Sequence, residues 1–365
     1  MFKRITIFLV LLLCTLSGAQ ALQVSAGSAV LIEKTTGRVI YAKNANTKMG
    51  MASTTKIMTA LLAVENCDTA DQVKILPEYA GIEGSSMYLK AGETVTVNDL
   101  LHGVMLMSGN DAATAIAGYC GGDVDAFVDM MNQKAAQLGL DKTRFENPSG
   151  LSHDNHYTTA YQLAVLTAYA LQNPVFKQIA STKTYTSQSG VYMSNHNRLL
   201  RSYRGATGVK TGFTKATGRC LVSSAERDGM ELIAVTLNAP NDWADHAAML
   251  DYGFANYKMV SLTTAGQTAH TSPVIAGVFD SVSLVFQQDC ALPLTQNEVG
   301  KLVKKLHAYP FSYAPVTAGQ RAGEFVAILD GKALCKVPLT YENSVDLEPE
   351  RSFIDKLLGR RRKGN

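Results

Sequence analysis

The sequence predicts an α/β (α+β) protein: an antiparallel sheet flanked by helices, followed by a small, mainly β domain. Three observations predict this fold class. Strand-like segments lie near both ends of residues 28–260, and helical patterns lie between them. Hairpins join the strands, which makes neighbouring strands antiparallel. After about residue 265, strand-like runs are broken by Pro and Gly turns, which is typical of a compact β domain.

The composition excludes several classes of protein. Of the 365 residues, 46% are apolar and 18% charged, which provides material for a buried core and excludes a disordered chain. The length suits two domains. The net charge is +3, but six basic residues stand at the two ends, and without them the body carries −3. A slightly acidic body gives no reason to expect a nucleic-acid partner.

Residues 1–21 have the pattern of a secretory signal peptide. Lys3 and Arg4 precede the apolar run 5–14, and an Ala-x-Ala site ends at Ala21. The run is well short of the roughly 20 residues that a membrane-spanning helix needs. We therefore expect cleavage after Ala21 and an exported, extracytoplasmic protein.

The other end, residues 349–365, is a candidate membrane-surface tail. Its apolar residues Phe353, Ile354, Leu357 and Leu358 fall on one helical face, and four consecutive basic residues follow. A short amphipathic helix with a basic flank can lie on an anionic membrane. A solvated tail without membrane contact is an equally acceptable interpretation.

The first domain is assigned to residues 22–262. A hairpin over 28–44 opens it, because apolar residues alternate on both sides of a Thr-Thr-Gly-Arg turn. A helix is predicted to begin at Ser53, where four apolar residues between 57 and 62 share one face. Further helices are predicted over 100–107, 110–119, 123–138, 161–171 and 244–257, and strands over 205–213, 218–225 and 231–237.

The second domain is assigned to residues 263–348. Its clearest strands are 282–286 and 325–329, and an Asp-Gly turn signal follows the latter. Five cysteines remain after removal of the signal peptide, so at least one is unpaired or pairs between chains. Cys67–Cys120 and Cys290–Cys335 are conceivable bridges, and buried free thiols are an equally acceptable interpretation.

The first chemical motif is Ser-Thr-Thr-Lys at 53–56, at the predicted start of a helix. Residues i and i+3 share a helix face, so Lys56 can reach the Ser53 hydroxyl. A serine needs a base to take its proton, and a lysine can be that base where burial and positive charge lower its pKa. The N–H groups at a helix start also suit an oxyanion. An N-cap serine with a solvated lysine is the alternative.

The second motif is Ser-Gly-Asn at 108–110, between an apolar and an Ala-rich helix. Ser108 could relay a proton and Asn110 could bind a substrate amide, although both residue types also favour helix N-caps.

The third motif is Lys-Thr-Gly-Phe at 210–213 on a predicted strand, where Lys210 and Gly212 face one side and Thr211 the other. Gly212 would allow a close approach to the backbone. Lys210 would supply positive charge for a carboxylate and for Lys56, or it is an ordinary edge lysine.

The three motifs occur in the order found in penicillin-binding proteins and class A β-lactamases. Over residues 23–260 the chain resembles the D-alanyl-D-alanine carboxypeptidases, the low-molecular-weight penicillin-binding proteins, and 265–348 resembles the β domain that follows in them. The resemblance is carried by residues 52–60, 107–113, 147–151, 157–160 and 208–214. Gln162 departs from the family, in which Asp is common, and the tail is shorter than typical anchors.

The resemblance implies a serine β-lactamase/penicillin-binding-protein-like fold, with a cleft beside the strand of Lys210. Ser53 would attack the carbonyl between the two D-alanines of a peptidoglycan stem peptide, and Lys56 would accept its proton. The backbone N–H groups of Ser53 and Phe213 would form the oxyanion hole. Ser108 would pass a proton to the leaving D-alanine.

The resemblance also implies the substrate contacts. Asn110 would hold the substrate amide, and Lys210 and Thr211 would bind the terminal carboxylate beside Gly212. Water would hydrolyse the acyl-enzyme, and β-lactam antibiotics would mimic the dipeptide and trap the serine.

Other candidate residues carry less chemistry. His153 and His156 have no third ligand nearby, so we expect no metal or cofactor and interpret both as loop residues. His196 could border the cleft. Asp242 and Asp245 are interpreted as solvated acids at a helix start.

Two alternatives to a carboxypeptidase remain. A class A-like β-lactamase would need a glutamate to activate water, and no Glu lies between Gly150 and Lys183. A non-catalytic wall-binding protein would be expected to lack Ser53, Lys56 or Lys210, and all three are present.

Overall fold

A five-stranded sheet lies at the centre of the first domain in the computed structural model, which describes residues 22–349. The strand order is β2-β1-β9-β8-β7, and every neighbouring pair is antiparallel. The strands are β1 (Ser28–Glu33), β2 (Val39–Lys43), β7 (Ala206–Thr214), β8 (Gly218–Arg227) and β9 (Met230–Leu237). The predicted hairpins and the antiparallel arrangement are confirmed. The predicted signal peptide and the tail beyond Pro349 lie outside the described residues.

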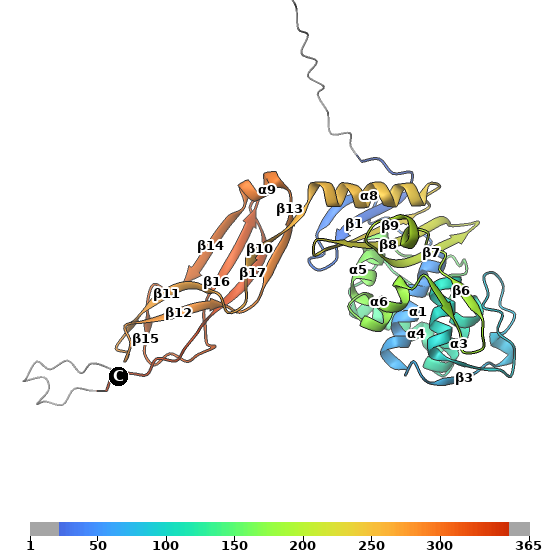
Figure 1. Cartoon of the computed structure of the whole chain (residues 1–365), viewed down its shortest axis with the longest axis horizontal. Coiled ribbons are helices and arrows are strands. Elements are labelled where there is room, and N and C mark those ends of the chain that lie inside the picture. Colours follow the sequence, from blue (N-terminus) through green and yellow to red (C-terminus); the bar gives the residue numbers. More distant parts are fainter. Residues whose placement is uncertain (1–21, 350–365) are drawn as a thin grey trace, which may run out of the picture.

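Helices cover both faces of this sheet (Figure 1). One face is covered by α8 (Asp242–Asn256), and the other by α1 (Lys56–Asn66), α5 (Ala160–Ala170) and α6 (Pro174–Ser181). The remaining helices of this domain are α2 (Val97–His102), α3 (Asn110–Gly121), α4 (Val124–Gln137) and the short α7 (Leu199–Ser202). The domain therefore has separate hydrophobic cores on the two faces of its sheet.

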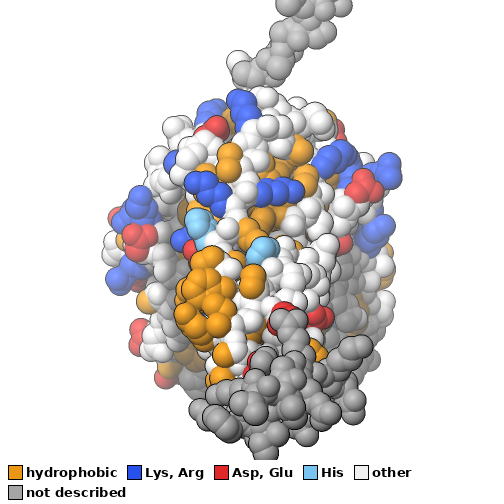
Figure 2. All heavy atoms as spheres, turned by 90° about the vertical axis from the view of Figure 1, so that its left-hand side faces the viewer, with side chains coloured by type: hydrophobic (Ala, Val, Ile, Leu, Met, Phe, Trp, Pro, Cys, Tyr) orange, Lys and Arg blue, Asp and Glu red, His pale blue; other side chains and the backbone are white. Residues whose placement is uncertain are grey.

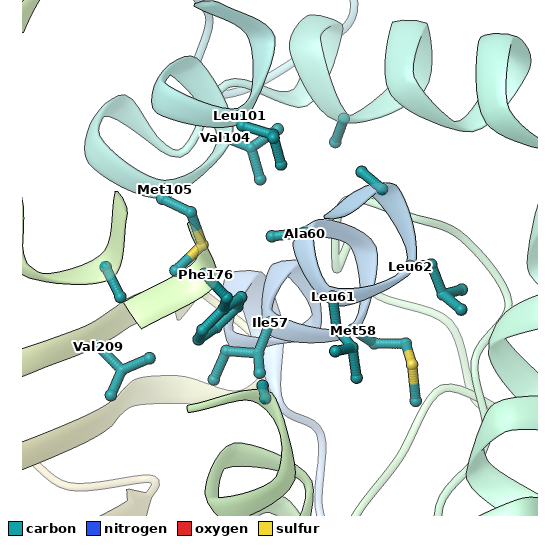
Figure 3. Packing of buried hydrophobic residues seen from close by; sticks show 14 of the residues in the cluster. Ile57, Met58, Ala60, Leu61, Leu62, Leu101, Val104, Met105, Phe176 and Val209 are labelled. Carbon is teal, nitrogen blue, oxygen red and sulfur yellow. The ribbon is translucent and has the colours of Figure 1, made fainter. Parts of the chain in front are cut away.

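Helix α1 is the centre of the larger core (Figure 3). Ile57, Met58 and Leu61 are fully buried, and Figure 3 shows Phe176 of α6 and Val209 of β7 beside Ile57. Each such side chain contributes roughly 1.5–3 kcal/mol through its removal from water. This packing fixes the start of α1 against β7, which matters because Ser53 and Lys56 lie there.

The structure differs from the sequence prediction in several elements. The helix predicted from Ser53 begins as a 3₁₀ turn, η1 (Ala52–Thr55), before α1. The helix predicted over 100–107 is divided into α2 and a π-helical turn, η3 (Gly103–Met107). Helix α6 was not predicted, although Asn173 caps it and Pro174 occupies its first turn. Two short strand pairs were also missed, β3 (Gln72–Lys74) with β4 (Thr94–Thr96) and β5 (Thr184–Thr186) with β6 (Tyr192–Ser194).

The second domain is mainly β, as predicted. Its larger sheet has the order β14-β16-β17-β12-β11-β15, and β10 pairs with β13 outside it. The strands are β10 (Lys258–Thr263), β11 (Thr268–Ile275), β12 (Ser281–Phe286), β13 (Cys290–Leu294), β14 (Val303–Ala308), β15 (Ser312–Tyr313), β16 (Arg321–Leu329) and β17 (Lys332–Tyr341). The predicted Asp330-Gly331 turn joins β16 to β17, with positive φ at both residues. One short helix, α9 (Gln296–Lys301), begins with a capping box.

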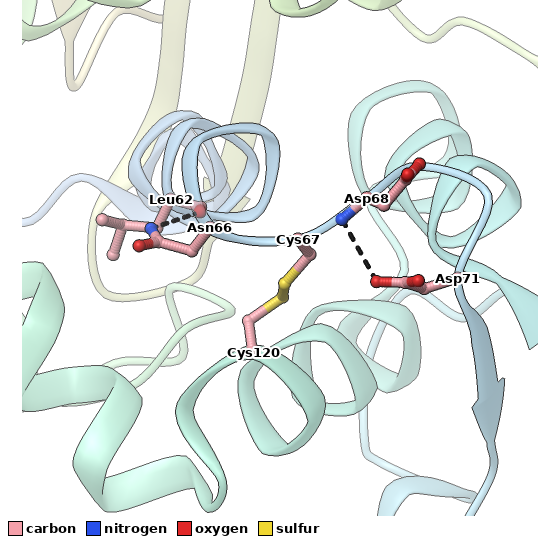
Figure 4. The surroundings of a disulfide bond; sticks show 6 residues. All are labelled: Leu62, Asn66, Cys67, Asp68, Asp71 and Cys120. Atoms are coloured by element: carbon pink, nitrogen blue, oxygen red, sulfur yellow. Dashed lines mark hydrogen bonds between the residues drawn. A yellow bond between two sulfur atoms is a disulfide. The ribbon is translucent and has the colours of Figure 1, made fainter.

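Both conceivable disulfides are present. Cys67 at the end of α1 is bonded to Cys120 in α3, where it ties two core helices together (Figure 4). Cys290 is bonded to Cys335 in the β domain, and Cys220 is a buried free thiol. Within residues 22–349, no helix is both long and apolar enough to cross a bilayer.

Candidate active site

A cleft of about 490 Å³ opens along the edge of β7. Three of the predicted site elements line it: Ser53 from η1, Ser108 from the turn before α3, and the strand residues from Thr211 to Phe213. Lys56, Asn110 and Lys210 are buried. The other lining residues are Ser85, Asn195, His196, Arg198, Arg219, Asp242 and Trp243.

The nucleophile segment and β7 touch through a glycine. A Cβ atom placed on Gly212 would lie 3.0 Å from the Ser53 nitrogen and 3.1 Å from the Thr54 nitrogen. Gly212 is expected from the sequence to admit substrate, and in the structure it also admits the protein's own η1 turn. Ala52 precedes Ser53 with a φ of 46°, a left-handed conformation that only the surrounding contacts can hold.

Lys56 faces the Ser53 hydroxyl. Its Nζ lies 3.2 Å from Ser53 Oγ, 2.7 Å from Asn110 Oδ1 and 2.5 Å from the Ser149 carbonyl oxygen. An unprotonated amine has two N–H groups and one lone pair. The two carbonyl oxygens can take the two N–H groups, which leaves the lone pair for the Ser53 proton. The solvated-lysine alternative is therefore excluded, because Lys56 is completely buried.

The electrostatic surroundings keep this amine available. Burial lowers the pKa of Lys56 well below its ordinary value, and the positive charge of Lys210 lowers it further, while Asp111 opposes both. Burial lowers the pKa of Lys210 to about 7, and its Nζ donates to the Thr211 carbonyl oxygen at 3.0 Å. The sequence allowed this arrangement and left an ordinary edge lysine as the alternative, which the complete burial of Lys210 excludes.

The Ser-Gly-Asn motif does not cap α3 with its side chains. Gly109 occupies the N-cap position, and Ser108 ends the π-helical turn in the left-handed conformation, with φ 61°. Asn110 donates from Nδ2 to the Glu83 carbonyl oxygen at 2.5 Å while its Oδ1 accepts from Lys56. Both polar ends of Asn110 are thus held inside the wall of the cleft.

Asp111 and Asn147 support the site from behind, and neither was predicted to do so. Asp111 accepts hydrogen bonds from the Met87 and Leu89 backbone nitrogens and holds the loop that brings Ser85 to the cleft. Asn147 Oδ1 accepts from the Gly150 nitrogen at 2.7 Å and so fixes the turn that presents the Ser149 carbonyl. The Asn147-Pro148 pair is a local turn signal, but nothing in the sequence around Asp111 identifies its partners at Met87 and Leu89.

His156 lies in a loop, as the sequence predicted, but it is not a solvated loop side chain. It is buried, its Nδ1 accepts from the Glu146 nitrogen at 3.0 Å, and its Nε2 therefore donates to Thr55 Oγ1 at 2.7 Å. Thr55 in turn donates to the Ala52 carbonyl oxygen at 2.8 Å. Burial lowers the pKa of His156 to about 4, so the ring is neutral near pH 7. Among residues 22–349, no His, Cys, Asp or Glu cluster could hold a metal ion.

The two aspartates that were predicted to be solvated acids at a helix start differ from that prediction. Asp242 and Asp245 are buried rather than solvated. Asp242 forms an ion pair with Arg219 at 2.9 Å, and Asp245 accepts from the Ser25 hydroxyl at 2.7 Å. His196 does border the cleft, as suspected, and burial together with the charge of Lys210 lowers its pKa.

Two family matches cover most of the chain. Residues 15–241 match the family described as D-alanyl-D-alanine carboxypeptidase, and residues 257–347 match the penicillin-binding protein 5, C-terminal domain.

Individual relatives agree with these matches. The D-alanyl-D-alanine carboxypeptidase DacF of Bacillus subtilis is 33% identical over 347 residues, which covers 92% of this chain and 89% of the relative. DacD of Escherichia coli is 32% identical, with 88% and 87% covered. Among solved structures, penicillin-binding protein 5 from Haemophilus influenzae matches with a TM-score of 0.77 and 30% identity, over 89% of this chain and 98% of that one.

Proposed function

Since this chain belongs to the D-alanyl-D-alanine carboxypeptidase family, we propose that it removes the terminal D-alanine from peptidoglycan stem peptides through an acyl-enzyme on Ser53. The observation that carries this proposal is the contact between the buried Lys56 amine and the Ser53 hydroxyl at the wall of an open cleft. This contact pairs a nucleophile with its base.

Acylation begins when Lys56 takes the Ser53 proton and Ser53 Oγ attacks the carbonyl carbon between the two D-alanines. The tetrahedral oxyanion is stabilised by the backbone N–H groups of Ser53 and Phe213, which line the same cleft. The proton that Lys56 took passes through the Ser108 hydroxyl to the leaving amine as the carbon–nitrogen bond breaks, so Lys56 is unprotonated again and D-alanine departs. Water then attacks the ester and regenerates Ser53.

The substrate is held along β7. Lys210 and Thr211 attract its terminal carboxylate, beside Gly212, and Asn110 holds the amide of the acyl part. A β-lactam presents a strained amide in the place of the dipeptide, so it acylates Ser53 as the peptide does. The β-lactamase alternative is not favoured, because the curated relatives are carboxypeptidases.

The place of action follows from the ends of the chain. Residues 1–21 direct export, and the amphipathic basic tail beyond Pro349 holds the protein on the outer face of the cytoplasmic membrane. The sequence assigns catalysis to residues 22–262 and the β domain to 263–348. Because β10 (Lys258–Thr263) pairs with β13, we place the start of the β domain a few residues earlier, at the start of β10.

The test combines a labelled penicillin with a D-Ala-D-Ala peptide. We expect a stable penicillin adduct on Ser53 by peptide mass mapping, and release of free D-alanine. Rapid penicillin turnover without peptide cleavage would indicate a β-lactamase. No adduct would indicate a wall-binding protein.

A base variant tests the assignment within the site. Lys56→Ala should slow acylation by about 10²–10⁴-fold, the usual contribution of a general base. An active Lys56→Ala variant would refute the assigned base.

A further inference from the structure

The end of the β domain farthest from the first domain exposes a group of large apolar side chains (Figure 1). We call this group the distal patch. Figure 2, which views the molecule from this end, shows hydrophobic side chains gathered on the surface. The distal patch consists of Val278, Phe279, Tyr309, Phe311, Tyr313 and Leu347, all of which are exposed. Contiguous exposed apolar surface of this kind marks an interaction site in a soluble domain.

Backbone pairing joins the three segments that carry the patch. The end of β11 pairs with β15, with Ile275 opposite Tyr313. The Val278 nitrogen donates to the Asp346 carbonyl oxygen at 3.0 Å, beside a bridge between Gly277 and Leu347. The rings of Phe311 and Tyr313 meet edge-on at 5.4 Å. The patch is therefore a preformed surface and not a set of unrelated loop residues.

The chain leaves the described structure at this patch. The Glu348 nitrogen donates to the Ala276 carbonyl oxygen at 2.7 Å, one residue before the last described position. The 16 residues that follow carry the amphipathic sequence pattern and the basic run. A surface that binds this tail therefore lies next to the distal patch.

We propose that the distal patch is a second membrane-contacting surface, whose side chains enter the headgroup region of a lipid bilayer next to the tail. This inference rests on the proposed location at a membrane surface. Tyrosine suits such a boundary, because its ring is apolar and its hydroxyl stays hydrated. A single short lipid-binding element gives only marginal, reversible attachment, and stable attachment takes two.

Two features favour a lipid surface over a protein partner. The patch is continuous with a tail whose composition is that of a membrane-surface segment, and it lies at the end of the domain farthest from the first domain (Figure 1). The acidic residues beside it, Asp280, Asp346 and Glu348, give it no attraction to anionic headgroups. Its contribution is therefore apolar, and added salt should not weaken it, whereas the attraction of the basic tail is screened by salt.

The test measures co-sedimentation of the exported chain with phosphatidylglycerol–phosphatidylcholine vesicles, in low salt and in about 0.5 M salt. The patch variant combines Phe279→Ser with Tyr313→Ser. The matched control is Tyr192→Ser, because Tyr192 is 65% exposed and Tyr313 66%, but Tyr192 lies on the first domain. We expect the patch variant to lose about tenfold in vesicle partition at both salt concentrations, and the control to bind as the wild type does.

A second measurement does not depend on removing aromatic packing. Phe279→Trp should be quenched by vesicles with brominated acyl chains. The native Trp243, the single tryptophan of the chain, lies in the cleft and should not be quenched. Absence of quenching in vesicle-bound Phe279→Trp protein would overturn the proposal.

Other outcomes separate this inference from the function on which it rests. If a chain ending at Pro349 is released while the patch variant stays bound, the tail anchors alone and the patch proposal fails. If the patch variant is released while the chain ending at Pro349 stays bound, the patch proposal stands and the tail proposal fails. Self-association that the patch variant abolishes, without any effect on vesicles, would identify a protein interface and overturn the lipid assignment. Hydrolysis of a soluble D-Ala-D-Ala peptide should be the same in all these variants. If the wild type does not hydrolyse this peptide, the proposed carboxypeptidase function fails and the membrane proposal is not affected.

Discussion

Two buried lysines determine the chemistry of this protein at the scale of single residues. Lys56 and Lys210 are among its largest fully buried side chains. Burial disfavours the charged form of each, and the charge of Lys210 further lowers the pKa of Lys56. In the proposed mechanism Lys210 therefore acts on two groups: on the substrate carboxylate directly, and on Ser53 through Lys56.

Lys210→Ala should shift the pH dependence of acylation as well as slow it. The base works only when unprotonated, so the rate falls as the pH drops below its pKa. Without the Lys210 charge the pKa of Lys56 rises, so the acidic limb of the profile moves to higher pH. Each unit of rise lowers the unprotonated fraction about tenfold below the pKa. Penicillin acylation followed from about pH 5 to pH 10 measures this. Lys215→Ala, an exposed lysine after β7, is the control, and an unshifted limb in Lys210→Ala would contradict the coupling.

His156 should position the nucleophile segment without exchanging a proton. Its hydrogen bond to Thr55 supports the Ala52 carbonyl next to Ser53. We expect His156→Ala to slow acylation about tenfold, because the hydrogen bond to Thr55 is lost and such a bond contributes about 1–1.5 kcal/mol. His156→Gln, which can still donate an N–H, should retain most of the rate. The shape of the pH profile between about pH 6 and 8 should not change, since the pKa of His156 is about 4. Equal rates in the Ala and Gln variants would argue against this role.

At the scale of secondary-structure elements, the site depends on the contact of η1 with β7. The edge strand carries Thr211 and Phe213 into the cleft, and Gly212 allows η1 to pack on it. The disulfide between Cys67 and Cys120 holds the other end of α1 to α3. The start of α1 is thus positioned by contacts along its whole length.

Gly212→Ala should impair acylation while leaving the protein folded. The new Cβ would lie 3.0 Å from the Ser53 nitrogen, so β7 and η1 must move apart by a few tenths of an ångström. A displaced oxyanion hole costs about 10–100-fold in rate, as misplacements near a reaction do. Gly300→Ala in α9 is the matched control, because a Cβ there would meet nothing within 4 Å. Penicillin acylation and thermal unfolding are measured together, and wild-type acylation in Gly212→Ala would contradict the packing argument.

At the scale of the whole molecule, Arg38 links the two domains. It follows the β1–β2 turn, donates to the Pro293 carbonyl oxygen and to Glu298, and stacks on Tyr257 with its guanidinium carbon 5.4 Å from the ring centroid. The contact is distant from the cleft and joins elements from both domains, so it affects their relative orientation and not the chemistry.

Arg38→Ala should broaden the distribution of interdomain distances without changing peptide hydrolysis. The ion pair is partly exposed and is worth less than about 1 kcal/mol, so the unfolding temperature should change little. Small-angle X-ray scattering measures the distribution, and a soluble D-Ala-D-Ala peptide measures activity. Arg204→Ala, an exposed arginine of the first domain, is the control. A distribution identical to that of the wild type would show that other contacts fix the orientation.

Local sequence patterns were sufficient to predict much of the fold and part of the candidate site. The hairpins, the amphipathic helices and the Ser-x-x-Lys spacing all express relations between residues close in sequence. Lys56 therefore lies next to Ser53 as its i+3 position requires. The Asn-Pro start of α6 is also a local signal, but this short helix lacks the long periodic pattern that would predict it.

Tertiary structure decided which groups converge on the site. Nothing near Lys56 in the sequence identifies Asn110 or Ser149 as its partners, and nothing near His156 identifies Thr55. The burial of Asp242 and Asp245 and the pairing of four cysteines were likewise settled only by folding. By itself the sequence determined the longer helices and strands, the domain order and the chemical groups, because these follow from local periodicity and residue type. The partners, the burial and hence the proton affinities arise only when segments distant in sequence meet away from water.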